Sequence, residues 1–436
     1  MKTVNVIGAG LAGCEAAYQL LKRGVKVNLY DLKPNKFTEA HKNPNFAELI
    51  CSNSLKSLDI NNAKGVLKQE LLELDSLLLK VAFQTKVPAG GALAVDREKF
   101  SESVTKELKK FKNLNFISKE VTEIDENALT IIATGPLTSE GLFNSLKKLL
   151  IHQDLYFFDA ISPIVSFNSL NKENYFIQDR YQKGEDDYIN CPLTKEEYDV
   201  FYNELINAET VELKDFENKK LFEGCMPVEA IAKRGEKSLL FGPLKPVGLI
   251  DPKTNKRPYA VVQLRKENNT GNMYNLVGFQ TNLKFNEQKR VFSLIPALKN
   301  AEYIRYGEMH KNIYINAPLN LTETYQLKNH KNIFIAGQLS GVEGYVESIA
   351  SGLYAGINMF NYINNLKPFI LPNFTMIGGL SYYNVNSNIE NFQPMNTNWG
   401  VILSNLGLES CKDKLTLANK SLNYIKEIKG EINGTT

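Results

Sequence analysis

Residues 3–31 read TVNVIGAGLAGCEAAYQLLKRGVKVNLYD, and this stretch decides the fold class. The apolar run 3–7 predicts a buried strand, and the alanine- and leucine-rich residues after the glycines predict an amphipathic helix that stops at Gly24. Residues 25–31 predict a second strand with an acid at its end. A strand, a glycine turn, a helix and a strand within roughly 30 residues form a βαβ unit. The sequence therefore predicts an α/β fold with parallel strands.

Three glycines, Gly8, Gly10 and Gly13, follow the first strand as G-x-G-x-x-G. The first permits a tight turn, the second lets backbone amides approach a pyrophosphate, and the third lets helix and strand pack closely. The phosphates are expected at the positive end of the helix. Asp31 ends the second strand and is expected to accept hydrogen bonds from ribose hydroxyls. The predicted dinucleotide site also includes the residues between the glycines, Ala9, Leu11 and Ala12.

Two later segments favour FAD over NAD as the dinucleotide. IIATGP at 131–136, which contains Gly135, resembles the strand and turn by which two-dinucleotide-type flavoproteins return to the cofactor. FIAGQLSGVEGY at 334–345 resembles the late flavin segment of that class, where a helix N-terminus approaches the flavin ring. We therefore expect a glutathione-reductase-like, FAD-binding Rossmann domain. The further residues expected to contact FAD are Gly337, Gln338, Gly344 and Tyr345.

The character of the sequence changes near residue 160, where Tyr, Asn, Asp and Lys become frequent and short strand-like pieces alternate with turns. We interpret residues 161–320 as an inserted α+β domain. The FAD-binding domain would then be discontinuous, with a first part at 1–160 and a second part at 321–436 that includes a C-terminal segment. Within the first part, residues 63–80 carry apolar side chains at helical spacing and predict one helix.

The composition is that of an ordinary globular protein, with 43% hydrophobic and 23% charged residues among 436. This excludes a chain that is disordered throughout. No apolar run approaches the ~18 residues of a membrane span, and the N-terminus has no signal-peptide pattern. Five cysteines without CxxC spacing and four histidines without ligand spacing predict no disulfide framework and no metal site, in the reducing cytoplasm. The net charge of +3 neither requires nor excludes a nucleic-acid partner.

Two cysteines stand in unusual surroundings. Cys51 lies in FAELICSNSLKS, which is rich in hydrogen-bond donors, and Cys225 lies in FEGCMPVEA, between glycine and proline. A thiolate nucleophile needs access and a positive neighbourhood, which Lys56 or the pair Lys233 and Arg234 would supply. A cysteine taken alone is more often an inert buried residue than a nucleophile. We interpret the remaining cysteines, Cys14, Cys191 and Cys411, as inert buried residues.

Taken together, these segments are similar to the folate- and FAD-dependent tRNA (uracil-5-)-methyltransferases of bacteria. The resemblance covers nearly the whole chain, and twelve segments in the family's order carry it. They are GAGLAGCEAA, LYDLKP, FAELICSNSLKS, PAGGALAVDREKFS, YFFDAISPIV, YINCPLTKEEYDVFY, FEGCMPVEAIAKRG, FGPLKPVGL, PYAVVQLR, YNLVGFQTNL, MHKNIYINAP and AGQLSGVEGYVES.

The resemblance implies transfer of a methylene carbon from 5,10-methylenetetrahydrofolate to C5 of a uracil, usually in the tRNA T-loop. Reduced FAD would convert the methylene to methyl, and NADH or NADPH would regenerate the flavin. By the same resemblance, Cys225 matches the cysteine that attacks C6 of uracil, and Cys51 matches the cysteine implicated in removal of the C5 proton. His310, in GEMHKN, matches the histidine that stacks on the folate pterin.

The chain departs from the family pattern at a few positions. Asp31 stands where Glu is usual, Lys33 and Lys311 where Arg is usual, and Ala317 where Ser is usual. Lys does not replace the forked donors of Arg where phosphate or carboxylate is bound, so the RNA target stays open between tRNA and 23S rRNA at this stage.

Four alternatives remain at this stage. The same chemistry on a uridine of 23S rRNA would leave the catalytic segments unchanged. A larger relative modifies the tRNA wobble uridine with the same cofactors, but it carries a long C-terminal helical domain for which this chain has no room. An RNA-binding flavoprotein without catalysis would have damaged cysteines. A generic NAD(P)H oxidase would need no folate or RNA segments. The oligomeric state and the RNA-binding surface are left open.

Overall fold

A computed structural model describes residues 2–38, 40–151, 155–160, 162–182, 187–211, 226–266, 271–307, 309–389, 392–408 and 413–432. For 155–160, 182, 309–312 and 431–432 it describes the backbone only.

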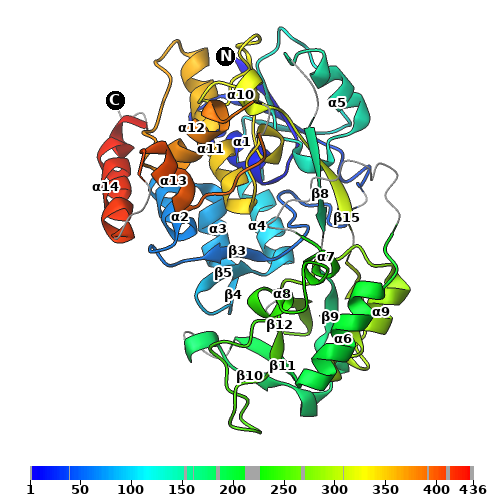
Figure 1. The fold of residues 1–436 in the computed structure, drawn as a ribbon. Helices are drawn as coiled ribbons and strands as arrows, with labels where there is room; N and C mark the ends of the chain where they lie inside the picture. The colour runs from blue at the N-terminus through cyan, green and yellow to red at the C-terminus, as the bar shows by residue number, and fades with distance from the viewer. Residues whose placement is uncertain are drawn as a thin grey trace.

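The predicted βαβ unit is present and lies at the centre of a five-stranded parallel sheet of order β16-β7-β1-β2-β6. The apolar side chains of its strands, Val4, Val6, Val27 and Leu29, are fully buried because helices cover the sheet (Figure 1). The sheet consists of β1 Thr3–Ile7, β2 Lys26–Asp31, β6 Leu114–Ser118, β7 Thr130–Ile132 and β16 Ile333–Ile335. The α/β class is therefore confirmed.

Helices α1 (Leu11–Leu21) and α11 (Tyr345–Ile363) pack against each other although they are far apart in sequence. Small residues make this close approach feasible. A Cβ atom added at Gly352 would lie 2.2 Å from the carbonyl oxygen of Ala12. The late glycine segment is thereby held against the first helix, at the same end of the sheet as the glycine turn.

The predicted single helix at 63–80 is wrong, because the structure has two helices there, α2 (Ala63–Glu73) and α3 (Leu77–Gln84). Asp75 separates them with a left-handed backbone, φ +65°. The buried Glu15 carboxylate accepts hydrogen bonds from Leu78 N at 3.0 Å and Ser76 Oγ at 2.8 Å, and so caps the second helix.

A small antiparallel sheet and further helices complete this part of the molecule. Buried Glu70 of α2 accepts hydrogen bonds from Met376 N and Ile377 N at the start of α12 and from Ser421 Oγ of α14, which ties the C-terminal helices to the body. The elements are β3 Ser54–Ser57, β4 Lys86–Val87, β5 Ala92–Val95, α4 Arg97–Lys109, α5 Glu140–Lys147, α10 Ala317–Asn320, α12 Met376–Asn386, α13 Trp399–Asn405 and α14 Lys414–Ile432.

Residues between the two halves of this body form a second, antiparallel sheet of order β10-β11-β12-β13-β9-β14, flanked by short helices, which is the expected α+β character. Two antiparallel strands, β8 (Leu155–Ala160) and β15 (Met309–Tyr314), run side by side between the two units (Figure 1). The elements of the second unit are β9 Ile164–Ser166, β10 Phe176–Ile177, β11 Tyr188–Leu193, β12 Ala260–Lys266, β13 Met273–Leu276, β14 Tyr303–Arg305, α6 Lys195–Asn207, α7 Val228–Ala232, α8 Ser238–Phe241 and α9 Phe285–Phe292.

Each unit has a large hydrophobic core. The first draws buried side chains from 4–149 and 314–425, and the second from 165–301. The boundaries 1–160, 161–320 and 321–436 remain predictions.

Candidate functional site

The glycine turn has the steric properties that the motif predicts. Gly8 has φ +103°, and a Cβ there would lie 2.6 Å from the carbonyl oxygen of Ala133. A Cβ on Gly13 would lie 1.8 Å from the carbonyl oxygen of Gly8. At Gly10, by contrast, no atom lies within 4 Å of an added Cβ, so this position borders open space at the start of α1. That space admits a pyrophosphate close to the helix N-terminus.

Asp31 lies beside the turn, as predicted. Its Oδ2 accepts a hydrogen bond from Ala9 N at 2.7 Å, and its Oδ1 accepts one from Lys33 N at 2.9 Å. The carboxylate therefore fixes the turn at the end of β2, next to the place where a ribose would bind.

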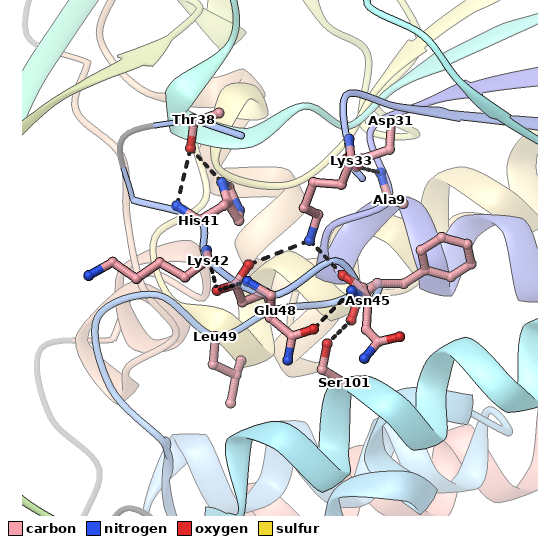
Figure 2. A network of polar contacts seen from close by, with 12 residues as sticks. Ala9, Asp31, Lys33, Thr38, His41, Lys42, Asn45, Glu48, Leu49 and Ser101 are labelled. Carbon is pink, nitrogen blue, oxygen red and sulfur yellow. Dashed lines mark hydrogen bonds and ion pairs between the residues drawn. The ribbon is translucent and has the colours of Figure 1, made fainter. Parts of the chain in front are cut away.

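A loop that the sequence interpretation missed closes over this region (Figure 2). Lys33 Nζ donates to Asn45 O at 2.6 Å and lies 3.5 Å from Glu48 Oε2. Glu48 Oε1 accepts hydrogen bonds from Lys42 N at 2.9 Å and from the next backbone amide. His41 Nδ1 lies 2.6 Å from Thr38 Oγ1. The only signal in the sequence was position, since Glu48 belongs to the Cys51 segment and residues 38–45 directly precede it.

Two adjoining pockets form one long cleft along the carboxyl ends of the parallel strands. Gly10, His41, Glu48, Thr134 and Leu137 line both. The first pocket continues past Asp31, and the second continues to further predicted residues, namely Leu11, Ala12, Gly135, Gly337, Gln338 and Tyr345, together with Cys51. An elongated dinucleotide fits this shape, because the turn leaves its central position free of protein atoms. Gly344 lies in a neighbouring cleft, and Ala9, Gly8 and Gly13 act through the backbone and packing of the turn.

Cys51 is half-buried at the inner end of this cleft and is held by Tyr345, the first residue of α11. The Tyr345 hydroxyl accepts hydrogen bonds from Cys51 N at 2.8 Å and Ser52 N at 3.2 Å, and lies 3.0 Å from Cys51 Sγ. Burial raises the pKa of this phenol well above its usual range, so the hydroxyl stays neutral. A residue predicted to bind the cofactor thus also positions a predicted catalytic cysteine.

A third cleft, here called the inter-sheet cleft, opens on the other side of Cys51. The residues shared with the second pocket are Cys51, Gln338, Tyr345 and Ser348, and the opposite wall is formed by Arg265, Asn275 and Gln280 of the second unit. Arg265 is buried and donates from Nη2 to Ser52 Oγ at 2.8 Å, and no carboxylate within the described ranges pairs with it. Sequence reasoning missed Arg265 and Asn275, although both lie in segments that carry the resemblance.

Cys225 lies outside the described residues, and so does the side chain of His310, whose backbone belongs to β15. The chain shortly after Cys225 is nevertheless fixed, because Val228 N donates to Gln280 O at 2.7 Å. Gln280 also lines the inter-sheet cleft, so Val228 is anchored to a residue that borders the cleft containing Cys51.

The other cysteines with described positions are inert. Cys14 and Cys191 are fully buried, and burial raises the pKa of both thiols. Cys411 lies outside the described residues. Nowhere in the described part of the chain do three or more His, Cys, Asp or Glu side chains gather as metal ligands. Within the same ranges, no helix combines the length and apolarity needed to cross a bilayer.

The parallel sheet, the glycine turn and the long cleft define a dinucleotide-binding α/β protein. A family model described as glucose inhibited division protein A matches residues 3–367, and the chain belongs to that family.

The resemblance to folate-dependent methyltransferases is confirmed by curated relatives. Methylenetetrahydrofolate–tRNA-(uracil-5-)-methyltransferase TrmFO of Acetivibrio thermocellus is 56% identical over 401 residues, 92% of each chain. The protein of the same name from Fusobacterium nucleatum is 53% identical over 432 residues, 98% of this chain and 99% of the relative. The crystal structure of Aquifex aeolicus GidA has the same fold, with a TM-score of 0.74 at 16% identity, and the match covers all of this chain and 74% of that one.

Proposed function

We propose that this protein methylates C5 of a uridine in tRNA, with 5,10-methylenetetrahydrofolate as the carbon donor and FAD as the redox cofactor. The names of the close relatives specify this reaction and give no support for 23S rRNA. The observation that supports the proposal is that one cleft, which adjoins the dinucleotide cleft, is lined by Cys51 and by Gln280, the residue that anchors Val228 three positions after Cys225. The proposed substrate implies a cytoplasmic location.

The chemistry explains why two cysteines are needed. C5 of uracil is a weak nucleophile until a thiolate, assigned here to Cys225, bonds to C6 and moves the C5–C6 electron pair toward O4. C5 then bonds to the methylene carbon as one of the two bonds of that carbon to folate nitrogens breaks. A base, assigned to Cys51, removes the C5 proton, and the second folate nitrogen leaves with its electron pair. Reduction of the resulting methylene to methyl restores the C5–C6 double bond as the Cys225 sulfur leaves C6. The target nucleotide has to leave its stack for both sulfur atoms to reach it.

The same geometry supports the cofactor assignment. Gly8, Gly10 and Gly13 would hold the pyrophosphate at the start of α1, and Asp31 the ribose end. Bound FAD, reduced by NADH or NADPH, supplies the electrons that convert methylene to methyl. The Cys51 loop and Tyr345 would border the flavin end, since both line the second pocket. His310 is assigned to the folate.

The test is a methyl-transfer assay with labelled methylenetetrahydrofolate, FAD and NADH on unmodified tRNA, on the same tRNA with the T-loop uridine replaced, and on a 23S rRNA fragment. We expect label only in the first. Cys225→Ala and Cys51→Ala should abolish transfer while leaving FAD bound. Cys191→Ala is the matched control, because this fully buried cysteine of the second unit lines none of these clefts and should retain activity. Label only in the rRNA fragment, or full activity in either cysteine variant, would contradict the assignment concerned.

A further inference from the structure

Two buried polar side chains face the inter-sheet cleft from adjacent strands. Arg265 of β12 and Asn275 of β13 are register partners, and both line the cleft. Their side chains are 6% and 3% exposed, respectively. Directly opposed residues on one face of an antiparallel pair lie side by side, so the two form one patch on the wall that faces Cys51.

Arg265 is used to join the two units. Its Nε donates to Asn53 Oδ1 at 3.1 Å and its Nη2 to Ser52 Oγ at 2.8 Å, while Asn53 Nδ2 donates back to Lys266 O at 2.7 Å. These bonds fix the two residues that follow Cys51 to strand β12. The position of Asn275 relative to Cys51 is therefore fixed as well.

Asn275 differs from the arginine because its buried Nδ2 has no hydrogen-bond partner in the described part of the chain. Asn190, on β11 of the same sheet, is a buried asparagine whose amide is hydrogen-bonded, as is usual. Its Nδ2 donates to Gln178 O at 2.8 Å and its Oδ1 accepts from Gln263 Nε2 at 2.8 Å. Buried polar groups are nearly always paired, so an amide left unpaired at the wall of a cleft indicates a group that a ligand completes.

The chemistry of a carboxamide limits what the ligand is. The carboxamide presents one donor and one acceptor side by side, whichever way the amide is turned. It therefore matches a ligand edge that has an N–H next to a C=O. Uracil has such an imide edge at N3–H and O4, and so does the pterin of folate. The location favours uracil, because the same cleft is lined by Cys51 and by Gln280, which anchors the chain after Cys225.

We propose that Asn275 is the residue that pairs with the N3–H and O4 edge of the target uracil and so selects the base for methylation. This inference rests on the proposed function and names its recognition group. Arg265 is a positioning residue that holds the Cys51 loop against the same wall. Contact at O4 also places a donor at the oxygen that gains charge when the thiolate adds at C6.

The experiment compares kcat/KM for tRNA carrying uridine or 3-methyluridine at the target position, because N3-methylation removes the imide hydrogen. The wild type should prefer uridine about 10- to 100-fold. Asn275→Ala should lower the value for uridine by a similar factor and leave that for 3-methyluridine nearly unchanged. Folate binding, monitored by flavin absorbance in a titration without RNA, should be unaffected by Asn275→Ala.

Stability provides the second readout. Asn275→Leu removes an unpaired amide at similar volume, so its Tm should equal or exceed that of the wild type. Asn190→Ala, which breaks satisfied bonds in the same sheet, should lower Tm without changing the uridine to 3-methyluridine ratio.

Each contrary result overturns the inference. Equal wild-type rates on both RNAs exclude imide recognition. An equal loss on both RNAs in Asn275→Ala, together with a lower Tm for Asn275→Leu, indicates a merely structural asparagine. Weaker folate binding in Asn275→Ala, with an unchanged ratio of kcat/KM for uridine and 3-methyluridine, assigns Asn275 to the pterin. A wild type that methylates no tRNA at all overturns the proposed function, and this inference with it.

Discussion

The dinucleotide turn and the inter-sheet cleft are built in opposite ways. The turn uses glycines within a few residues of one another, and its shape depends on the absence of side-chain atoms, as at Gly13 against Gly8 O. The cleft is assembled from side chains of distant segments, and it depends on hydrogen bonds such as those of Tyr345 with Cys51 and of Arg265 with Ser52. At Gly8 and Gly13 the turn therefore has no room for an added atom, whereas the Cys51 side of the cleft depends on these hydrogen bonds.

The largest effect is expected for Gly13→Ala. Its Cβ would lie 1.8 Å from Gly8 O, so α1 would have to move away from β1. We expect a loss of at least about 3 kcal/mol of unfolding free energy, measured by urea denaturation. Gly10→Ala is the control, because no protein atom lies within 4 Å of its Cβ. It should fold normally and lose FAD affinity, read from flavin absorbance after gel filtration. Equal stability of the two variants would remove the steric account of the turn.

An intermediate effect is expected for Tyr345→Phe, which removes the acceptor for Cys51 N and Ser52 N. Leaving buried donors unpaired costs about 1–3 kcal/mol each, and a freed Cys51 loop should lower the single-turnover rate about 10- to 100-fold. Tyr354→Phe is the matched change on the same helix, where the hydroxyl accepts from Leu371 N at 2.8 Å. It should lower Tm and leave turnover intact. If both variants lose turnover equally, the contact at Cys51 has no special role.

The smallest effect concerns a site outside both regions. Burial raises the pKa of Glu70 from 4.5 to about 7. Because the unfolded chain releases this proton more readily, the stabilising contribution of the protonated group is complete below pH 4.5 and is lost as the pH rises toward about 7. The loss amounts to roughly 1–3 kcal/mol. Glu70→Gln should have a flatter Tm profile between pH 5 and 7.5, with the pH dependence of methyl transfer unchanged. An unaltered profile would show that the carboxyl is ionised throughout.

The parts of the site that follow local rules were predictable from the sequence. Gly8, Gly10, Gly13 and Asp31 act on neighbours a few residues away or on the adjacent strand, so their spacing specifies their geometry. The break at Asp75 was not predicted, because the apolar spacing continues through it. The cap that starts α3 comes from Glu15, which is distant in sequence.

The cleft could not be derived in this way. That Asn275 lies opposite Arg265 depends on the register of β12 and β13, and that both face Cys51 depends on how the second sheet docks on the first unit. No spacing within one segment encodes either fact. The roles of Cys225 and His310 remain predictions from the resemblance.

The sheet order has a consequence for the sequence of events during synthesis. Strand β16 pairs with β7 through Ile333 and Thr130, and α11 covers α1, so the nucleotide-binding body cannot close until the ribosome has passed these late segments. Within the described residues, the core of the second unit draws on residues 165–301, so this unit is complete earlier and can fold first. Until β16 has been synthesised, the nascent body exposes an unpaired edge at β7. Binding of the dinucleotide therefore has to wait for the last third of the chain.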